Sequence, residues 1–159
     1  MISSYDVHKA NILVVDDQEA NVSLLVRLLR GAAYTSIDST TDPRKVYGLH
    51  RKKQYDLIVL DVVMPGMDGF QVMDALREIE TGSYVPVLMI TAQPEHKLRA
   101  LREGAKDFVS KPINTAEVLM RVFNLLEVRL LYRELQEKNI ELESARARLG
   151  EAGKTEPVA

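Results

Sequence analysis

Four short apolar segments, each ended abruptly by polar residues, limit what this chain can fold into. They cover residues 12–15, 57–60, 87–90 and 108–109. The second segment is apolar without alternation, which is typical of a strand buried on both faces of a parallel sheet. If all four are strands of one parallel sheet, the polar groups behind them gather at one edge. Those groups are Asp16 with Asp17, Asp61, Thr91, and Lys111 after Ser110.

Helix-forming stretches separate the apolar segments, so the chain alternates strand and helix. Strands are predicted at about 11–15, 36–39, 57–60, 87–90 and 107–109, and helices at about 20–30, from Pro43, at 69–80, at 95–103 and from residue 114 or 115. Glycines at 31 and 104 are predicted to end two of the helices. This alternation predicts right-handed crossovers and a parallel sheet covered on both faces. We therefore expect a flavodoxin-like (βα)5 doubly wound sheet with strand order 2-1-3-4-5, in which the first and third strands are neighbours.

The strand-end residues form a set with one chemistry. A single aspartate at a strand end is more often a helix cap than a site, but Asp16, Asp17 and Asp61 would meet in the predicted fold. Carboxylates in one cleft repel unless a cation lies among them, and oxygen ligands suit Mg²⁺. Asp61 is then a candidate nucleophile toward phosphorus, as in aspartyl-phosphate enzymes. Thr91 and Lys111 are candidates to bind the phosphoryl oxygens.

Composition excludes several other classes of protein. The formal net charge is −2, and no basic stripe interleaved with aromatic residues is present, so we expect no nucleic-acid binding. The absence of cysteine rules out disulfides and thiolate metal sites. The first residues do not form a signal peptide, and no apolar stretch reaches the ~20 residues that span a bilayer, so we expect a cytoplasmic protein without a membrane segment. Three histidines, His8, His50 and His96, share no metal-binding spacing and are expected at the surface.

Taken together, the motifs resemble the receiver domain of bacterial two-component response regulators. The resemblance covers about residues 10–127, and its motifs, taken together, are specific to this family. The matching motifs are Val14-Val15-Asp16-Asp17, Leu60-Asp61, Met64-Pro65-Gly66-Met67-Asp68-Gly69, Ile90-Thr91-Ala92, Gly104-Ala105 and Phe108-Val109-Ser110-Lys111-Pro112.

The resemblance implies a role for each site residue. Asp61 would accept a phosphoryl group from a sensor histidine kinase, while Asp16, Asp17, Asp61 and the backbone carbonyl of Val63 hold Mg²⁺. Thr91 and Lys111 would bind the phosphoryl oxygens. Thr91 would also move toward the phosphate, and the aromatic residue three positions before the lysine, here Phe108, would swing inward. Many relatives carry tyrosine at that position, so a hydroxyl contact is lost in this chain.

The site is expected to hold phosphate rather than to turn over substrates. Val63 and Gln93 lie where relatives often carry groups that position the hydrolytic water, which predicts at most self-phosphorylation and slow self-dephosphorylation. An alternative is a phosphatase resembling the haloacid dehalogenase superfamily. Those enzymes carry a second aspartate two residues after the nucleophile as general acid, and this chain has Val63 there. A receiver that only binds partners is a third alternative, disfavoured because every phosphorylation group is present.

The last predicted helix is unusually long. No glycine or proline interrupts residues 114–149 after Pro112, and apolar residues recur at alternating spacings of three and four. This pattern predicts a coiled-coil seam and a homodimer, with Lys138 weakening the seam and Ile140 lying outside it. A solvated helical tail is the alternative, and the arms could instead pack on the partner's receiver. The predicted dimerisation residues are Val128, Leu131, Leu135, Leu142 and Leu149.

These features divide the chain into three parts. We predict a receiver domain over residues 1–127 and a helical extension over residues 128–149. Residues 150–159 are predicted to form a flexible tail. No DNA-binding helix-turn-helix follows within these residues, so output is expected to pass through protein contacts or dimer geometry.

Overall fold

A five-stranded parallel sheet forms the centre of the molecule. The computed structural model describes residues 2–79 and 85–154. The strands are β1 (Asn11–Val15), β2 (Ser36–Thr40), β3 (Leu57–Asp61), β4 (Val87–Thr91) and β5 (Asp107–Ser110). Their order is β2-β1-β3-β4-β5, and every neighbouring pair is parallel. The predicted flavodoxin-like sheet and its strand order are confirmed.

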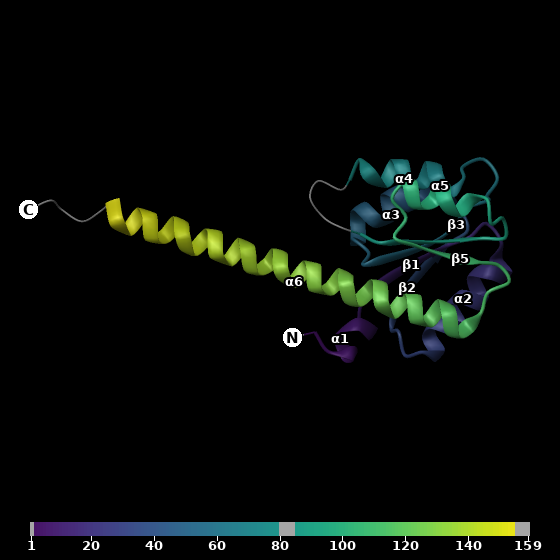
Figure 1. Ribbon diagram of the computed structural model, residues 1–159, viewed down its shortest axis with the longest axis horizontal. Coiled ribbons are helices and arrows are strands. Elements are labelled where there is room, and N and C mark those ends of the chain that lie inside the picture. The colour runs from purple at the N-terminus through teal and green to yellow at the C-terminus, as the bar shows by residue number, and fades with distance from the viewer. Residues whose placement is uncertain (1, 80–84, 155–159) are drawn as a thin grey trace, which may run out of the picture.

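Helices cover both faces of the sheet (Figure 1). One face carries α3 (Val46–Lys53), α4 (Gly69–Arg77) and α5 (His96–Arg102), with the short 3-10 helix η1 (Pro43–Lys45) before α3. The other face carries α1 (Ser4–His8), α2 (Glu19–Gly31) and α6 (Thr115–Lys154). Apart from the half-buried Asn11, the three central strands are buried because each contributes side chains to both apolar layers.

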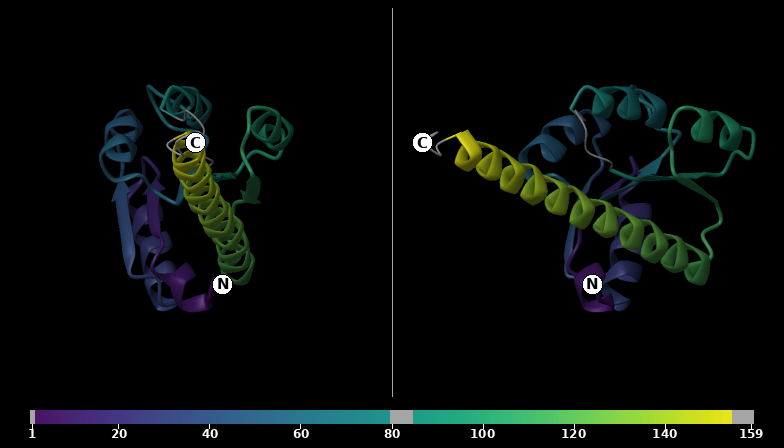
Figure 2. Two further views of the ribbon diagram at one scale, coloured as in Figure 1. Left: turned by 90° about the vertical axis from the view of Figure 1, so that its left-hand side faces the viewer. Right: turned by 60° about the vertical axis from the view of Figure 1, so that its left-hand side comes forward.

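The helix α6 is the most distinctive element. It contains 40 residues and packs on the sheet through Val118, Val122 and Leu126, all of which are fully buried. Beyond these residues it leaves the receiver body and projects from it, as Figures 1 and 2 show. The helix continues to Lys154, past the predicted end near Leu149, so residues 150–154 are helical rather than part of a tail. The rest of the predicted tail lies outside the described residues.

Two local predictions are wrong, and one helix was not predicted. The helix α1 was not predicted; Ser3 and Asp6 form a capping box at its start, and Val7 anchors it by burial. Gly31 does not end α2, because it is the last helical residue and Ala33 takes the left-handed conformation at φ 73° instead. The helix α4 ends at Arg77, short of the predicted residue 80, which lies outside the described residues. Gly104 behaves as predicted, with φ 102° just after α5.

Within the described residues, none of the helices has the combination of length and apolarity that crossing a bilayer would require.

Candidate functional site

The carboxyl ends of β1 and β3 bring three aspartates together. These strands are direct neighbours in the sheet, so Asp16 and Asp17, which follow β1, lie beside Asp61 at the end of β3. One carboxylate oxygen of each residue lies within 4.8 Å of the others. Asp16 and Asp61 are buried, and Asp17 is half-buried. Three oxygen ligands at one open sheet edge are the chemistry that Mg²⁺ prefers, so the donor set fits that metal.

Lys111 supplies the positive charge at this cluster. Its ammonium nitrogen lies 3.2 Å from Asp61 Oδ1 and 3.3 Å from Asp16 Oδ2. Burial alone would lower the pKa of Lys111, but the two carboxylates outweigh it and raise the pKa. The lysine precedes a cis peptide bond to Pro112, and its backbone N–H donates to the Thr91 carbonyl at 2.8 Å. The β5–α6 connection is thereby tied to the end of β4.

The surroundings of Asp61 raise the pKa of its carboxyl group. Burial and the neighbouring Asp16 carboxylate raise the pKa of Asp61 to about 6 from an ordinary value of 3.8, while Lys111 opposes the shift. The unliganded cluster is therefore short of positive charge. A cation bound among the three carboxylates would relieve this deficit.

Thr91 completes the group of predicted phosphate ligands at the same edge. Its side chain is buried, and its hydroxyl accepts a hydrogen bond at 3.1 Å from the backbone N–H of Gln93. This bond leaves the hydroxyl proton of Thr91 available for an oxygen ligand. Val63 and Gln93 are exposed at the rim, as expected for residues that face an incoming water.

One supporting residue was not predicted. Asp16 Oδ1 accepts hydrogen bonds from the Gln18 backbone N–H at 2.9 Å and from Asn21 Nδ2 at 3.3 Å. These contacts orient Asp16 and leave its other oxygen for Lys111 or a metal. Asn21 lies one helical turn after Asp17. An amide side chain at that spacing was the only feature of the sequence that could have indicated its contact with Asp16.

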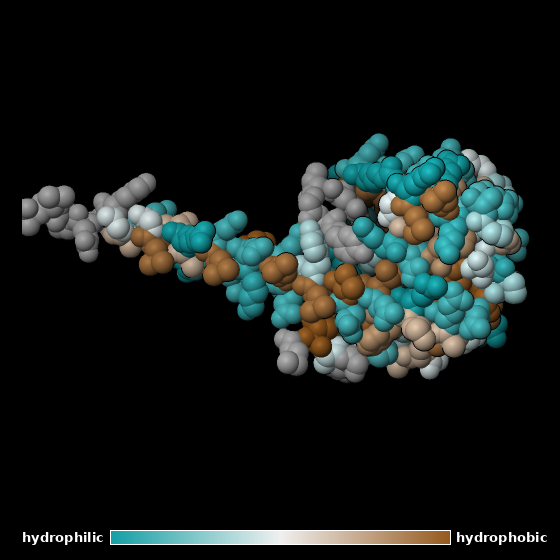
Figure 3. Space-filling model, in the orientation of Figure 1, coloured by the Kyte–Doolittle hydropathy of each residue, from teal (hydrophilic) through white to brown (hydrophobic). Residues whose placement is uncertain are grey.

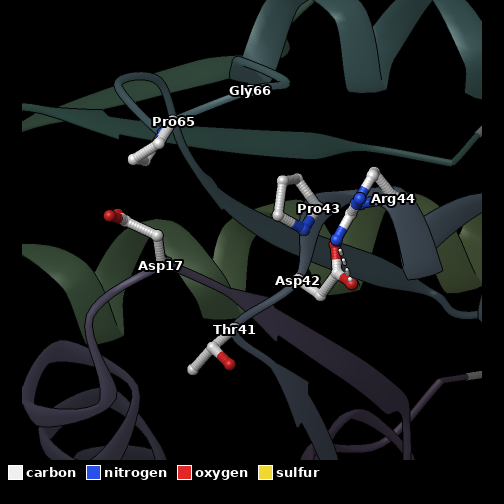
Figure 4. A pocket seen from close by; sticks show the side chains of 7 residues that line it. All are labelled: Asp17, Thr41, Asp42, Pro43, Arg44, Pro65 and Gly66. Carbon is white, nitrogen blue, oxygen red and sulfur yellow. Dashed lines mark hydrogen bonds and ion pairs between the residues drawn. The ribbon is translucent and has the colours of Figure 1, made fainter.

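A pocket of about 630 Å³ opens beside Asp17 (Figure 4). In this view the Asp17 carboxylate lies on the side of Pro65, while Arg44 lies on the far side, paired with Asp42 at 3.0 Å. Of the three aspartates, Asp17 lines this pocket, so the half-buried member of the cluster is accessible from this side. The remaining lining comes from Thr41, Pro43 and Gly66.

The loop after β3 is shaped by two glycines. Gly66 has φ 79°, a left-handed turn conformation that favours glycine. Gly69 begins α4 in close contact with the strand end, and a Cβ there would lie 2.6 Å from the Asp61 carbonyl oxygen. The start of α4 and the backbone of Asp61 therefore fit together only with glycine at residue 69.

Other predicted residues lie away from the cluster. Phe108 is buried among the side chains under α4 and α5, so its ring already points inward. The five predicted dimerisation residues are exposed along α6 and take no part in the site.

The surface prediction for His50 is wrong, because His50 is 3% exposed and its Nδ1 accepts a hydrogen bond from the Tyr55 backbone N–H. Burial, together with the nearby Arg129 charge, lowers the pKa of His50 and favours its neutral form.

Comparison with known proteins identifies the family. The response regulator receiver domain matches residues 12–123. The response regulator PleD of Caulobacter vibrioides is 39% identical over 131 residues, covering 81% of this chain. The chain spans only 29% of that relative.

Solved structures agree with this assignment. The chemotaxis protein CheY4 of Vibrio cholerae has 29% identity and a TM-score of 0.68, covering 74% of this chain and 98% of that one. The receiver domain of the sensor histidine kinase PA1611 of Pseudomonas aeruginosa has 25% identity and the same TM-score of 0.68, covering 75% of this chain and 98% of that one. It is described with a magnesium ion coordinated in the active site cleft. The haloacid dehalogenase-like alternative has no support, and the chain belongs to the response regulator receiver domain family.

Proposed function

We propose that this receiver takes a phosphoryl group onto Asp61 from a sensor histidine kinase in the cytoplasm. The observation that carries the proposal is the buried Asp61 carboxylate at the end of β3, held within 4.8 Å of two further carboxylates and 3.2 Å from Lys111. A carboxylate so placed has a positive charge beside it and oxygen atoms within reach that can hold a cation. These are the requirements of a nucleophile that attacks phosphorus.

The transfer follows from the positions of these groups. A carboxylate oxygen of Asp61 attacks phosphorus, and the bond between phosphorus and the donor imidazole nitrogen breaks with its electron pair remaining on the imidazole. The Lys111 ammonium and the Thr91 hydroxyl would bind the phosphoryl oxygens. Asp16, Asp17, Asp61 and the Val63 carbonyl would hold Mg²⁺, which neutralises charge on the transferred group.

Acetyl phosphate tests the phosphoacceptor proposal directly. Incubation with acetyl phosphate and Mg²⁺ should add one phosphoryl group per chain, measured by intact-protein mass spectrometry. Asp61→Asn should abolish the gain, whereas Asp74→Asn, an exposed aspartate on α4, should not. Multiple turnover of acetyl phosphate without a phosphorylated intermediate would instead indicate a phosphatase, and no mass gain would indicate a receiver that only binds partners.

We further propose that the phosphorylated form is long-lived. The supporting observation is that Val63 and Gln93 are both exposed at the rim, and neither side chain can act as a general base there. Val63→Asp should shorten the lifetime by placing a water-orienting carboxylate near the phosphoryl group. The rate is measured from loss of the phosphorylated mass after the donor is removed. A half-life of seconds in the unaltered protein would contradict the proposal.

The extension of α6 is proposed to pair two chains. Its seam residues Val128, Leu131, Leu135, Leu142 and Leu149 are all at least half exposed, in an otherwise charged helix. Figure 3 shows apolar side chains spaced along the projecting arm. An exposed helix of this composition is only marginally stable without a partner surface, so pairing would stabilise it. We propose the same division of the chain as a receiver followed by this arm, with output through protein contacts or dimer geometry.

A further inference from the structure

A buried ion-pair cluster lies at the opposite end of β3 from the acidic site. Asp56, directly before β3, is 2% exposed, and both of its carboxylate oxygens are used. Oδ2 accepts a hydrogen bond from the Asn11 backbone N–H at 2.9 Å. Oδ1 accepts one from Arg133 Nη1 at 2.9 Å, and Arg129 Nε lies 3.5 Å from the same atom. Both arginines come from α6, just where that helix leaves the receiver body.

The two arginines continue the buried stripe of α6. Val118, Val122 and Leu126 are fully buried, and Arg129 follows at 6% exposure. At 3.6 residues per turn, Arg129 and Arg133 lie within about 60° of Leu126 around the helix axis. The apolar contact with the sheet is thus followed along this stripe by the ion pairs of the two arginines with Asp56.

The apolar seam lies on the other side of the same helix. Leu131, Leu135 and Leu142 lie about 140–180° around the axis from Leu126. They are 50%, 59% and 61% exposed, against 0% for Leu126. A rotation of α6 by half a turn would exchange the two faces. The buried Val118, Val122 and Leu126 oppose this rotation within the receiver, and the contacts of Asp56 oppose it where the arm leaves the receiver.

We infer that Asp56, Arg129 and Arg133 form a joint that holds the rotation of α6 where the arm leaves the receiver, so that its seam faces away from the receiver and toward a second copy of this chain. The joint is a property of one chain and can be tested whether or not the arms pair. The identity of the partner rests on the pairing proposed above. Because the seam is opposite the receiver, two paired arms would carry their receivers on the outer sides.

The charges beside the seam favour parallel arms. With Val128, Leu135 and Leu142 as equivalent positions of successive heptads, Glu141 of one arm would lie beside Arg146 of the other in a parallel pair. Lys138 lies within the seam, and its ammonium is 3.7 Å from Glu141 of its own helix, which offsets part of its charge. A second copy therefore meets complementary charges as well as an apolar surface.

Spin-label distances test the joint. The chain has no cysteine, so Lys52→Cys on α3 and Glu143→Cys on the arm give two unique labels at exposed positions. With the labelled protein diluted in unlabelled chain, one narrow distance distribution is expected. Arg129→Met with Arg133→Met should broaden it. Arg133→Met alone keeps the buried pair of Arg129 and Asp56, so it should broaden the distribution less. This single variant can be measured even if the double variant does not fold.

Arg121→Met is the matched control for this experiment. Arg121 is on the same helix, is 38% exposed against 45% for Arg133, and pairs with Asp107 at 2.8 Å. It precedes the apolar contacts of Leu126, so its loss should leave the distribution narrow. A distribution that is broad in the unaltered chain, unchanged by the arginine variants, or broadened equally by Arg121→Met would overturn the joint.

Disulfide formation tests the arrangement of the partner. Leu142→Cys should cross-link two parallel arms under oxidation, because equivalent seam positions face each other within the reach of a disulfide. Glu143→Cys, on the outer side, should not. A dimer by light scattering without the Leu142→Cys cross-link would overturn parallel pairing but leave the proposed dimer intact. A monomer by light scattering would overturn both.

Discussion

Two features of Asp61 destabilise its charged form. It is buried, and it lies beside a second carboxylate, so its negative charge is held at a cost in folding free energy. Lys111 compensates for only part of this charge, since it is shared between Asp61 and Asp16. The Asp61 carboxylate therefore destabilises the fold unless a cation offsets its charge.

Neutralising Asp61 should stabilise the protein when metal is absent. Its pKa of about 6 in the folded state, against 3.8 ordinarily, means that protonation favours folding. This contribution is complete below about pH 3.8 and is lost as the pH rises through 6. Asp61→Asn should raise the free energy of unfolding by about 1–3 kcal/mol at pH 7.5 with a chelator, and by roughly half as much at pH 5.

Denaturant unfolding of both proteins at the two pH values measures this difference. Added Mg²⁺ should stabilise the unaltered protein and have little effect on Asp61→Asn. An asparagine variant that is less stable than the unaltered protein at pH 7.5 without metal would contradict the interpretation of the cluster.

At the scale of elements, the site depends on how α4 begins. The first helical residue, Gly69, donates its backbone N–H to the Val62 carbonyl at 2.9 Å, which holds the helix against the end of β3. Asp68 caps the helix by accepting from the Gln71 N–H. Packing between α4 and β3 therefore determines where the Asp61 carboxylate lies relative to Asp16 and Lys111.

A methyl group at residue 69 should disturb both stability and the site. Gly69→Ala would place Cβ 2.6 Å from the Asp61 carbonyl oxygen, and relieving this clash should cost about 1–3 kcal/mol of unfolding free energy. Gly48→Ala is the control, because that helical glycine has no neighbouring atom within 4 Å and alanine there should stabilise by up to about 1 kcal/mol. Thermal unfolding and the rate of phosphorylation measure the two effects. Equal behaviour of the variants would contradict this account.

Sequence reasoning succeeded where the pattern is local. The strands were predictable because their apolar segments are short and end abruptly, and the order of those ends placed Asp16, Asp61 and Lys111 at one edge. The predictions failed where a distant contact decides the structure. His50 is buried because Tyr55 folds back onto it, and Asp56 meets Arg133 across 77 residues of sequence. The hydrophobic periodicity of the sequence around these residues indicates neither contact.

At the scale of the whole molecule, the chain consists of a packed receiver and a projecting arm. The receiver buries its apolar residues in two layers around the sheet. The arm leaves Leu135, Leu142 and Leu149 exposed by 59%, 61% and 73%. Apolar exposure of this kind, in register along one helix, favours self-association.

Charges introduced into the seam should separate the proposed dimer. Leu135→Glu with Leu142→Glu should yield monomers at concentrations where the unaltered chain is dimeric, because each seam layer would then bury like charges. Lys138→Leu should have the opposite effect and strengthen the dimer by completing the apolar seam. Sedimentation equilibrium measures both. If the double glutamate variant associates as tightly as the unaltered chain, the receiver surfaces rather than the arms hold the copies together.

The length of α6 beyond Arg133 turns small movements near the receiver into large ones elsewhere. The helix extends to Lys154, which is about 30 Å further at 1.5 Å per residue. A tilt of about 10° at Asp56 therefore moves the far end by about 5 Å, close to one helical pitch. Asp56 directly precedes β3 and Asp61 ends it, so a small displacement of that strand would be amplified into a sideways movement of the far end of α6.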